Sequence, residues 1–133
     1  MDYLKIVLGL SGVGNLANGL WMLAAPRTWY LLLPAGIPDF GAYNEHFIRD
    51  LGIMFTVFGA ALAFAAFKPA VRATVISLLL LWFSLHSVLH VVEVLRGYVE
   101  AVHLWVDIPL CHVPTVILAG LLVLERRKTH EAR

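Results

Sequence analysis

The sequence predicts an all-α integral membrane protein, an antiparallel bundle of four transmembrane helices. Hydrophobic residues make up 60% of the 133 residues and charged residues only 14%, whereas soluble domains carry about 25% charged residues. The mean hydropathy of +0.80 agrees with this class. Four apolar segments reach the length of about 20 residues that a helix needs to cross a bilayer. They cover residues 6–25, 47–67, 73–95 and 104–124, and the chain is short enough to form one domain, residues 1–133.

The positions of lysine and arginine predict that both termini face the cytoplasm. Basic residues favour the cytoplasmic side of membrane proteins, and an even number of spans brings three basic groups of this chain to one side. They are Lys5, then Lys68 and Arg72 in the second connection, then Arg126, Arg127, Lys128 and Arg133. The first apolar segment is longer than that of a signal peptide and no small-residue cleavage site follows it. We therefore expect a retained first helix in a multi-pass protein of the cell inner membrane.

Charge and cysteine content limit the partners. The net charge is only +1, which argues against nucleic acid, and Cys111 is the only cysteine. One cysteine excludes an intrachain disulfide and a thiolate-rich metal site. The expected partners are the lipid bilayer and a lipophilic small molecule, and a homo-oligomer is left open.

The first span carries Asn15 and Asn18 on one face, together with several glycines. Small residues let membrane helices approach closely, and asparagine hydrogen-bonds across their interfaces. Helix packing is therefore the favoured interpretation of both asparagines, and a supporting role in a site is the alternative. Both lie in the outer half of the span, where the other polar groups are expected.

The first connection, residues 26–45, is long for so small a domain. Trp29 and Tyr30 suit the aromatic belt at a membrane interface, and the proline and glycine residues that follow interrupt regular structure. Long connections often act as lids over sites. A lid over the outer mouth of the bundle and a passive interfacial anchor are the two interpretations.

The second span begins with a polar turn. Asn44 is a plausible N-cap, and His46 and Asp50 lie four residues apart, hence on one helix face. Arg49 either forms a local ion pair with the neighbouring Asp50 or orients a ligand.

The third span has the most informative pattern. His86, His90 and Glu93 are spaced i, i+4 and i+7, which places them within a helical stripe about 60° wide. Ionisable groups in a membrane segment are costly, usually face a bundle interior or a watery cavity, and mark function. This stripe therefore points to a functional site.

The fourth span repeats the histidine–carboxylate spacing in His103 and Asp107. Two prolines, Pro109 and Pro114, then interrupt the helical hydrogen bonds. His112 lies between them, and its favoured interpretation is a core histidine with a satisfied hydrogen bond. The alternative is a ligand of a second site.

Antiparallel topology brings these groups together near the outer ends of their helices, with no comparable polar set expected in the cytoplasmic half. The predicted metal ligands are His46, Asp50, His86, His90, Glu93, His103 and Asp107. The supporting residues are Asn15, Asn18, Arg49 and His112.

Imidazole and carboxylate groups on facing helices are how di-metal sites are built in bundles, and this ligand set favours Zn, Fe, Mn or Cu. The sequence thus predicts one or two divalent ions in a protein that acts on or senses a lipophilic or redox substrate. An oxidoreductase or a hydrolase is the matching enzyme class. The alternatives are b-type haem held by His86 with His46 or His112, proton-coupled transport, metal-free acid–base catalysis, and a structural subunit of a membrane complex.

The run Asn44-Glu45-His46-Phe47-Ile48-Arg49-Asp50-Leu51-Gly52, with His86, His90 and Glu93 later in the chain, resembles the small four-helix bacterial membrane proteins of the DoxX-like group. The resemblance covers most of the chain in length and hydropathy. It implies the four-helix fold and no particular activity.

Overall fold

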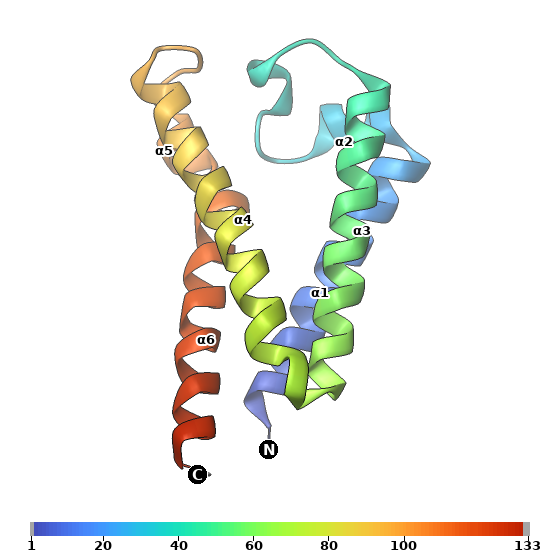
Figure 1. The fold of residues 1–133 in the computed structure, drawn as a ribbon. Helices are drawn as coiled ribbons and strands as arrows, with labels where there is room; N and C mark the ends of the chain where they lie inside the picture. The colour runs from blue at the N-terminus through green and yellow to red at the C-terminus, as the bar shows by residue number, and fades with distance from the viewer. Residues whose placement is uncertain (1, 132–133) are drawn as a thin grey trace.

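Four long helices dominate the protein in a computed structural model that describes residues 2–131 (Figure 1). They are α1 (Tyr3–Ala24), α3 (Glu45–Phe67), α4 (Pro69–Leu95) and α6 (Val113–Glu131). The shorter elements are α2 (Pro26–Leu32), the 3-10 helix η1 (Ile37–Phe40), α5 (His103–Val106) and the π-helix η2 (Ile108–His112). The described residues contain no strand, which confirms the predicted all-α class.

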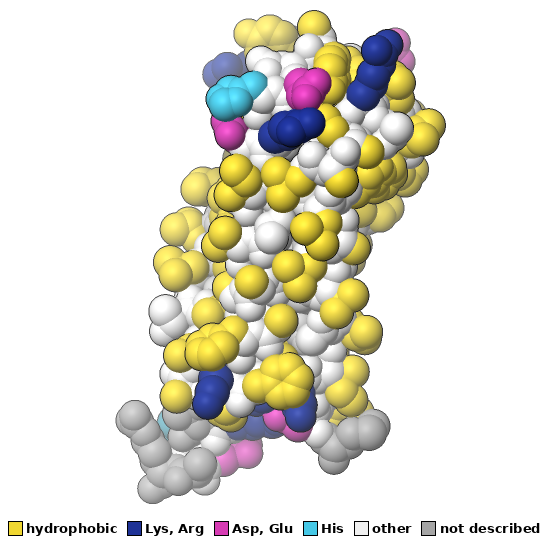
Figure 2. All heavy atoms as spheres, turned by 90° about the vertical axis from the view of Figure 1, so that its right-hand side faces the viewer, with side chains coloured by type: hydrophobic (Ala, Val, Ile, Leu, Met, Phe, Trp, Pro, Cys, Tyr) yellow, Lys and Arg dark blue, Asp and Glu magenta, His cyan; other side chains and the backbone are white. Residues whose placement is uncertain are grey.

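Four helical segments are long and apolar enough to cross a membrane. They are Tyr3–Ala24, Glu45–Phe67, Pro69–Leu95 and Ile108–Lys128. Figure 2 shows hydrophobic side chains over the middle of one face of the molecule, with charged side chains gathered toward its two ends. A multi-pass membrane protein has this distribution, because its middle is solvated by lipid and its ends by water.

The long helices form two antiparallel pairs, α1 with α3 and α4 with α6, which meet mainly through α3 and α4 (Figure 1). Both termini lie at one end of the molecule, called here the terminal end. The opposite end, called the distal end, carries α2, η1 and α5. The two pairs diverge toward the distal end. There, the part of the first connection that follows α2, residues 33–44, lies between the two pairs.

Glycines bring α1 and α3 into close contact, which agrees with the helix-packing interpretation of the glycines in the first span. A methyl group at Gly12 would lie 2.8 Å from the Ala63 nitrogen, and one at Gly59 would lie 2.5 Å from the Leu16 nitrogen. Each glycine therefore touches the backbone of the partner helix. Gly9 and Gly14, by contrast, have nothing within 4 Å and take no part in this contact.

The fourth span, predicted at residues 104–124, is interrupted in the region of its two prolines, as the sequence indicated. It consists of α5, a turn at Asp107, η2 and then α6. Pro109 and Pro114 lack amide donors, so the i→i−4 hydrogen bonds cannot run unbroken through this region. A π-turn accommodates the interruption, and it decides where the side chains of η2 point.

Arg72 is buried at the terminal end, a correction to the prediction that it fills the second connection. Because α4 begins at Pro69, Lys68 alone joins α3 to α4 and Arg72 lies in the first turn of α4. The Arg72 guanidinium donates to the carbonyl oxygens of Ala65 at 3.0 Å and Ala66 at 2.8 Å. It thereby satisfies carbonyl groups that the end of a helix leaves without amide partners.

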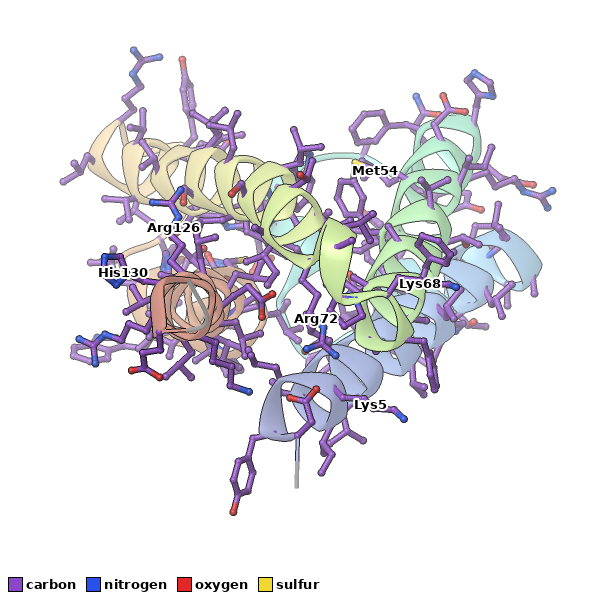
Figure 3. All side chains as sticks on the ribbon, turned by 60° about the horizontal axis from the view of Figure 1, so that its bottom comes forward. Lys5, Met54, Lys68, Arg72, Arg126 and His130 are labelled. Carbon is purple, nitrogen blue, oxygen red and sulfur yellow. The ribbon has the colours of Figure 1, made fainter. Side chains whose placement is uncertain are left out.

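The terminal end also holds a polar set that the sequence did not predict. Asp2 pairs with Arg72 at 3.0 Å and with Lys128 at 3.3 Å. Glu125 on α6 is only 8% exposed. Figure 3 shows Arg72 pointing between the helices, whereas Lys68 points outward. This network ties the start of the chain to α4 and α6.

Candidate metal centre

α4 supplies two histidines to the centre. His86 and His90 are one helical turn apart and half-buried, and their ring centroids are 4.5 Å apart. The His86 ring also stacks on the indole of Trp82, with centroids 4.8 Å apart and planes inclined by 20°. These contacts restrict both imidazoles before any ligand binds.

Cys111 from the π-helix completes the group. Its Sγ lies 3.7 Å from His86 Nε2 and 3.6 Å from His90 Nε2, and the side chain is only 5% exposed. The three ligand atoms all lie within 4.8 Å of one another. Single-turn π-helices often occur at functional sites, and here the turn directs a thiol toward two imidazole nitrogens.

These separations suit a shared metal ion. A tetrahedral zinc ion, bound about 2.0 Å from nitrogen and about 2.3 Å from sulfur, holds those two atoms about 3.6 Å apart. The observed sulfur–nitrogen distances are 3.6 and 3.7 Å. Two imidazoles and one thiolate can thus share one ion, and a fourth position remains for water or another ligand.

Asp107 orients His90. Its side chain is 1% exposed, and its Oδ2 accepts a hydrogen bond from His90 Nδ1 at 2.8 Å. With its proton on Nδ1, the ring presents the Nε2 lone pair toward Cys111. Carboxylates commonly fix metal-binding histidines in this way.

His103 links the centre to the distal surface. It is 2% exposed, with Nδ1 3.3 Å from Asp107 Oδ1 and Nε2 3.1 Å from Asp39 Oδ2. Burial alone lowers the pKa of an imidazole, but the hydrogen bonds to the Asp39 and Asp107 carboxylates raise the pKa of His103 above its usual value. Because both ring nitrogens face carboxylates, the arrangement suits an imidazolium that donates to each of them.

The first connection lies directly over these histidines. The Phe40 ring packs against His90 and His103, with centroid distances of 4.8 and 4.7 Å. Gly36 has φ 59°, and a methyl group there would lie 2.9 Å from His103 Cε1. These contacts agree with the lid interpretation of this connection.

α2 anchors the start of the same connection. Trp29 is 6% exposed, and its Nε1 donates to Asn18 Oδ1 at 2.8 Å. Asn15 Nδ2 donates within α1, to the Ser11 carbonyl at 2.9 Å. Both asparagines thus act in local structure, which agrees with the packing interpretation.

Two predicted ligands are located apart from this group. His46 and Asp50 pair with each other at 3.4 Å on α3, with 90% and 57% of their side chains exposed. Arg49 forms a local ion pair on the same helix, but its partner is Glu45 at 3.0 Å rather than the neighbouring Asp50. Figure 2 shows histidine, acidic and basic side chains together at one end of this face.

Glu93 and His112, the remaining predicted residues, have surroundings different from those of His86, His90 and Cys111. Glu93 is half-buried one turn beyond His90, and no described residue hydrogen-bonds or ion-pairs with its carboxylate. His112 is half-buried, and its Nδ1 is hydrogen-bonded to Ser87 Oγ. That bond agrees with a core histidine rather than with a ligand of the centre.

Sequence reasoning missed Cys111 and Asp39. A signal existed for Cys111, because His103, Asp107 and Cys111 follow one another at four-residue intervals and such residues share a helix face. Because one cysteine excludes a thiolate-rich site, Cys111 was not considered as the single sulfur ligand of a mixed site. Asp39 had no local signal, because its position depends on the path of the connection.

Comparison with known proteins adds no information about the family or the function of this chain. No family model, no curated protein and no solved structure matches this chain.

Proposed function

We propose that this chain is a multi-pass inner-membrane protein that binds one transition-metal ion between His86, His90 and Cys111. The observation that carries the proposal is the convergence of two Nε2 atoms and one Sγ within 4.8 Å of one another. The buried Asp107 carboxylate supports it, because it holds His90 in the tautomer that metal binding requires.

The ligand set narrows the metals predicted from the sequence. Sulfur together with imidazole favours Zn or Cu, whereas Mn prefers oxygen ligands and Fe lies between them. An open fourth position allows the ion to polarise a bound molecule or to exchange electrons with it. Because the site is built within membrane-length helices, a lipophilic or redox-active membrane molecule is the matching substrate class.

A metal-free proton path is the second candidate. Asp39, His103, Asp107 and His90 form an unbroken series of hydrogen-bonded contacts at 3.1, 3.3 and 2.8 Å. Chains of histidine and carboxylate are the usual proton relays of membrane pumps and transporters. A hydrogen-bonded thiol at Cys111 then replaces the metal as the end of the series.

Metal analysis of the purified protein separates these candidates. We expect about one equivalent of zinc or copper in the wild type, and loss of that equivalent in His86→Ala, His90→Ala and Cys111→Ser variants. His46→Ala and His130→Ala are the matched controls, because both side chains are exposed and lie outside the centre. Both controls should retain the metal.

Three other results contradict the proposal in different ways. Loss of metal in His46→Ala places the ligands at the exposed pair on α3 instead. A Soret band in the absorption spectrum replaces the metal ion with haem. Protein that stays metal-free after exposure to zinc and to copper leaves the proton path as the favoured function.

A further inference from the structure

We propose that a cavity at the distal end is the entrance through which a divalent cation reaches the centre, and that Phe40 is its gate. The cavity has a volume of about 570 Å³. It is lined by Asp39, Gly97, Tyr98, Val99 and Glu100. This inference rests on the proposed metal site and adds the route by which the ion arrives.

The charge of this entrance cavity suits a cation. Asp39 and Glu100 both line it and both are exposed. Carboxylate oxygens attract hydrated divalent ions, and a cleft with charge of one sign raises the local concentration of its counter-ion. The segments that carry the two carboxylates are far apart in the sequence, and both lie at the distal end (Figure 1).

A polar route leads inward from the entrance cavity. Asp39 is 64% exposed yet contacts the 2% exposed His103 at 3.1 Å. His103 contacts Asp107, and the Asp107 carboxylate lies 2.8 Å from His90 Nδ1. Asp39 thus joins the mouth of the cavity to the side chains that orient a ligand of the centre.

The Phe40 ring covers two side chains of this series. It packs against both His90 and His103, with centroid distances of 4.8 and 4.7 Å. Gly36 and Gly41 flank the segment with φ values of 59° and 143°, angles at which glycine moves without steric penalty. Rotation about these two positions swings Phe40 away from the histidines, as loop hinges do in other gated sites.

The approach from the terminal end is closed to ions. Trp82 stacks on His86 at 4.8 Å on that side. Beyond it, Leu79, Phe83 and Leu118 belong to the buried apolar cluster. A charged ion is strongly disfavoured in such surroundings, so the distal cavity is the route that the side chains favour.

Stopped-flow loading with Co²⁺ tests the charge of the entrance, using metal-free protein in detergent and the thiolate-to-cobalt absorption as the signal. At low ionic strength we expect Glu100→Gln to load roughly threefold more slowly than wild type. The difference should shrink in high salt, because exposed charges are screened. Glu45→Gln is the matched control: Glu45 is an exposed acid at the same end that pairs with Arg49 outside the cavity.

The role of Phe40 as a gate is tested with a separate variant and a separate control. We expect Phe40→Ala to load and to release Co²⁺ about tenfold faster, with an almost unchanged dissociation constant, because the gate changes rates and removes no ligand. Phe47→Ala is the control, since Phe47 is 58% exposed on α3. A merely structural role of Phe40 predicts weaker binding instead of faster exchange.

The outcomes separate the entrance from the centre itself. If either variant loads cobalt at the rate of its control while wild type binds one equivalent, the entrance proposal is overturned and the centre stands. If wild type shows no thiolate-to-cobalt absorption, the metal centre fails, and the entrance fails with it.

Discussion

Asp107 connects the ligand His90 with His103 beneath the first connection. Its two carboxylate oxygens lie 2.8 Å from His90 Nδ1 and 3.3 Å from His103 Nδ1, and its side chain is 1% exposed. A buried carboxylate of this kind is tolerated when donors surround it. The same two bonds fix the tautomer of His90 and hold His103 beneath the first connection.

Asp107→Asn tests this role directly. The amide offers one acceptor oxygen and places an NH₂ group against a histidine N–H, so one of the two hydrogen bonds is lost. We expect zinc affinity to fall about 10- to 100-fold, as for other carboxylates that orient ligands. A competition titration with a chromogenic chelator measures this, and Asp50→Asn on the exposed face of α3 should match wild type. Equal affinity in all three proteins contradicts the orienting role.

The raised pKa of His103 predicts a pH-dependent stability. A group whose pKa is higher in the folded state stabilises that state fully below its unfolded pKa of about 6.5. This contribution is lost as the pH rises through the raised, folded-state pKa. Metal-free protein should therefore unfold at progressively lower temperature as the pH is increased through that range. A His103→Gln variant lacks the titrating group and should show a flatter curve, and parallel curves for the two proteins exclude His103 as the cause.

At the scale of elements, the π-helix η2 shows why periodicity alone could not locate the centre. In a straight helix successive residues turn by about 100°, which would place Cys111 on the face of His103 and Asp107. The two prolines interrupt the helix, so the sequence left the direction of the Cys111 and His112 side chains undefined. The interruption at Pro109 adds a wider turn. As a result Cys111 faces His86 and His90. The prolines predicted that the helix breaks, but not which side chain the break directs inward.

The α1–α3 pair is the element in which sequence and structure agree most directly. The glycines of the first span predicted close packing without identifying the partner helix, and the distances of 2.5 to 2.8 Å for added methyl groups at Gly59 and Gly12 show that this partner is α3. The sequence could not distinguish these glycines from Gly9 and Gly14, because all lie in the same apolar helical pattern. Only the contact with a particular partner backbone separates them.

Gly59→Ala tests the packing of this pair. A methyl group at Gly59 meets the Leu16 nitrogen at 2.5 Å, so the helices must separate, at a cost of about 1–3 kcal/mol in the free energy of unfolding. Gly9→Ala is the matched control, because nothing lies within 4 Å of that position. Alanine there should be neutral or slightly stabilising, since it favours helix more than glycine does. Unfolding in mixed micelles with increasing denaturing detergent measures both changes, and equal stability of the two variants contradicts the close contact.

For the whole molecule, hydropathy was sufficient to predict the fold class and the four apolar segments, because lipid imposes a length and a composition on each helix. The arrangement of polar groups needed tertiary information. His86, His90, His103 and Asp107 do converge, whereas His46 and Asp50 remain exposed on α3. Equal depth along two helices does not bring side chains together when the helix pairs diverge toward the distal end (Figure 1).

The buried network at the terminal end likewise depends on tertiary contacts. Arg72 was counted only as a basic residue near a helix end, yet it is 5% exposed and bonded to two carbonyl groups of α3. Its position follows from Pro69 starting α4 immediately after Lys68. A residue placed one turn inside a helix, rather than in a loop, can point toward neighbouring helices, and charge counting along the sequence cannot detect this.

The exposed basic residues predict how the whole molecule is oriented in the membrane. The terminal end exposes Lys5, Lys68, Arg126, Arg127 and Lys128. Basic residues near the ends of transmembrane helices are retained on the cytoplasmic side, so the metal centre and its entrance are expected to face the outside of the inner membrane. Single cysteines in a Cys111→Ser background test this with a membrane-impermeant maleimide. Ala42→Cys should be labelled in cells whose inner membrane is intact, and Lys68→Cys only after lysis. The reverse pattern inverts the molecule and places the centre at the cytoplasmic face, where a different pool of metal ions supplies it.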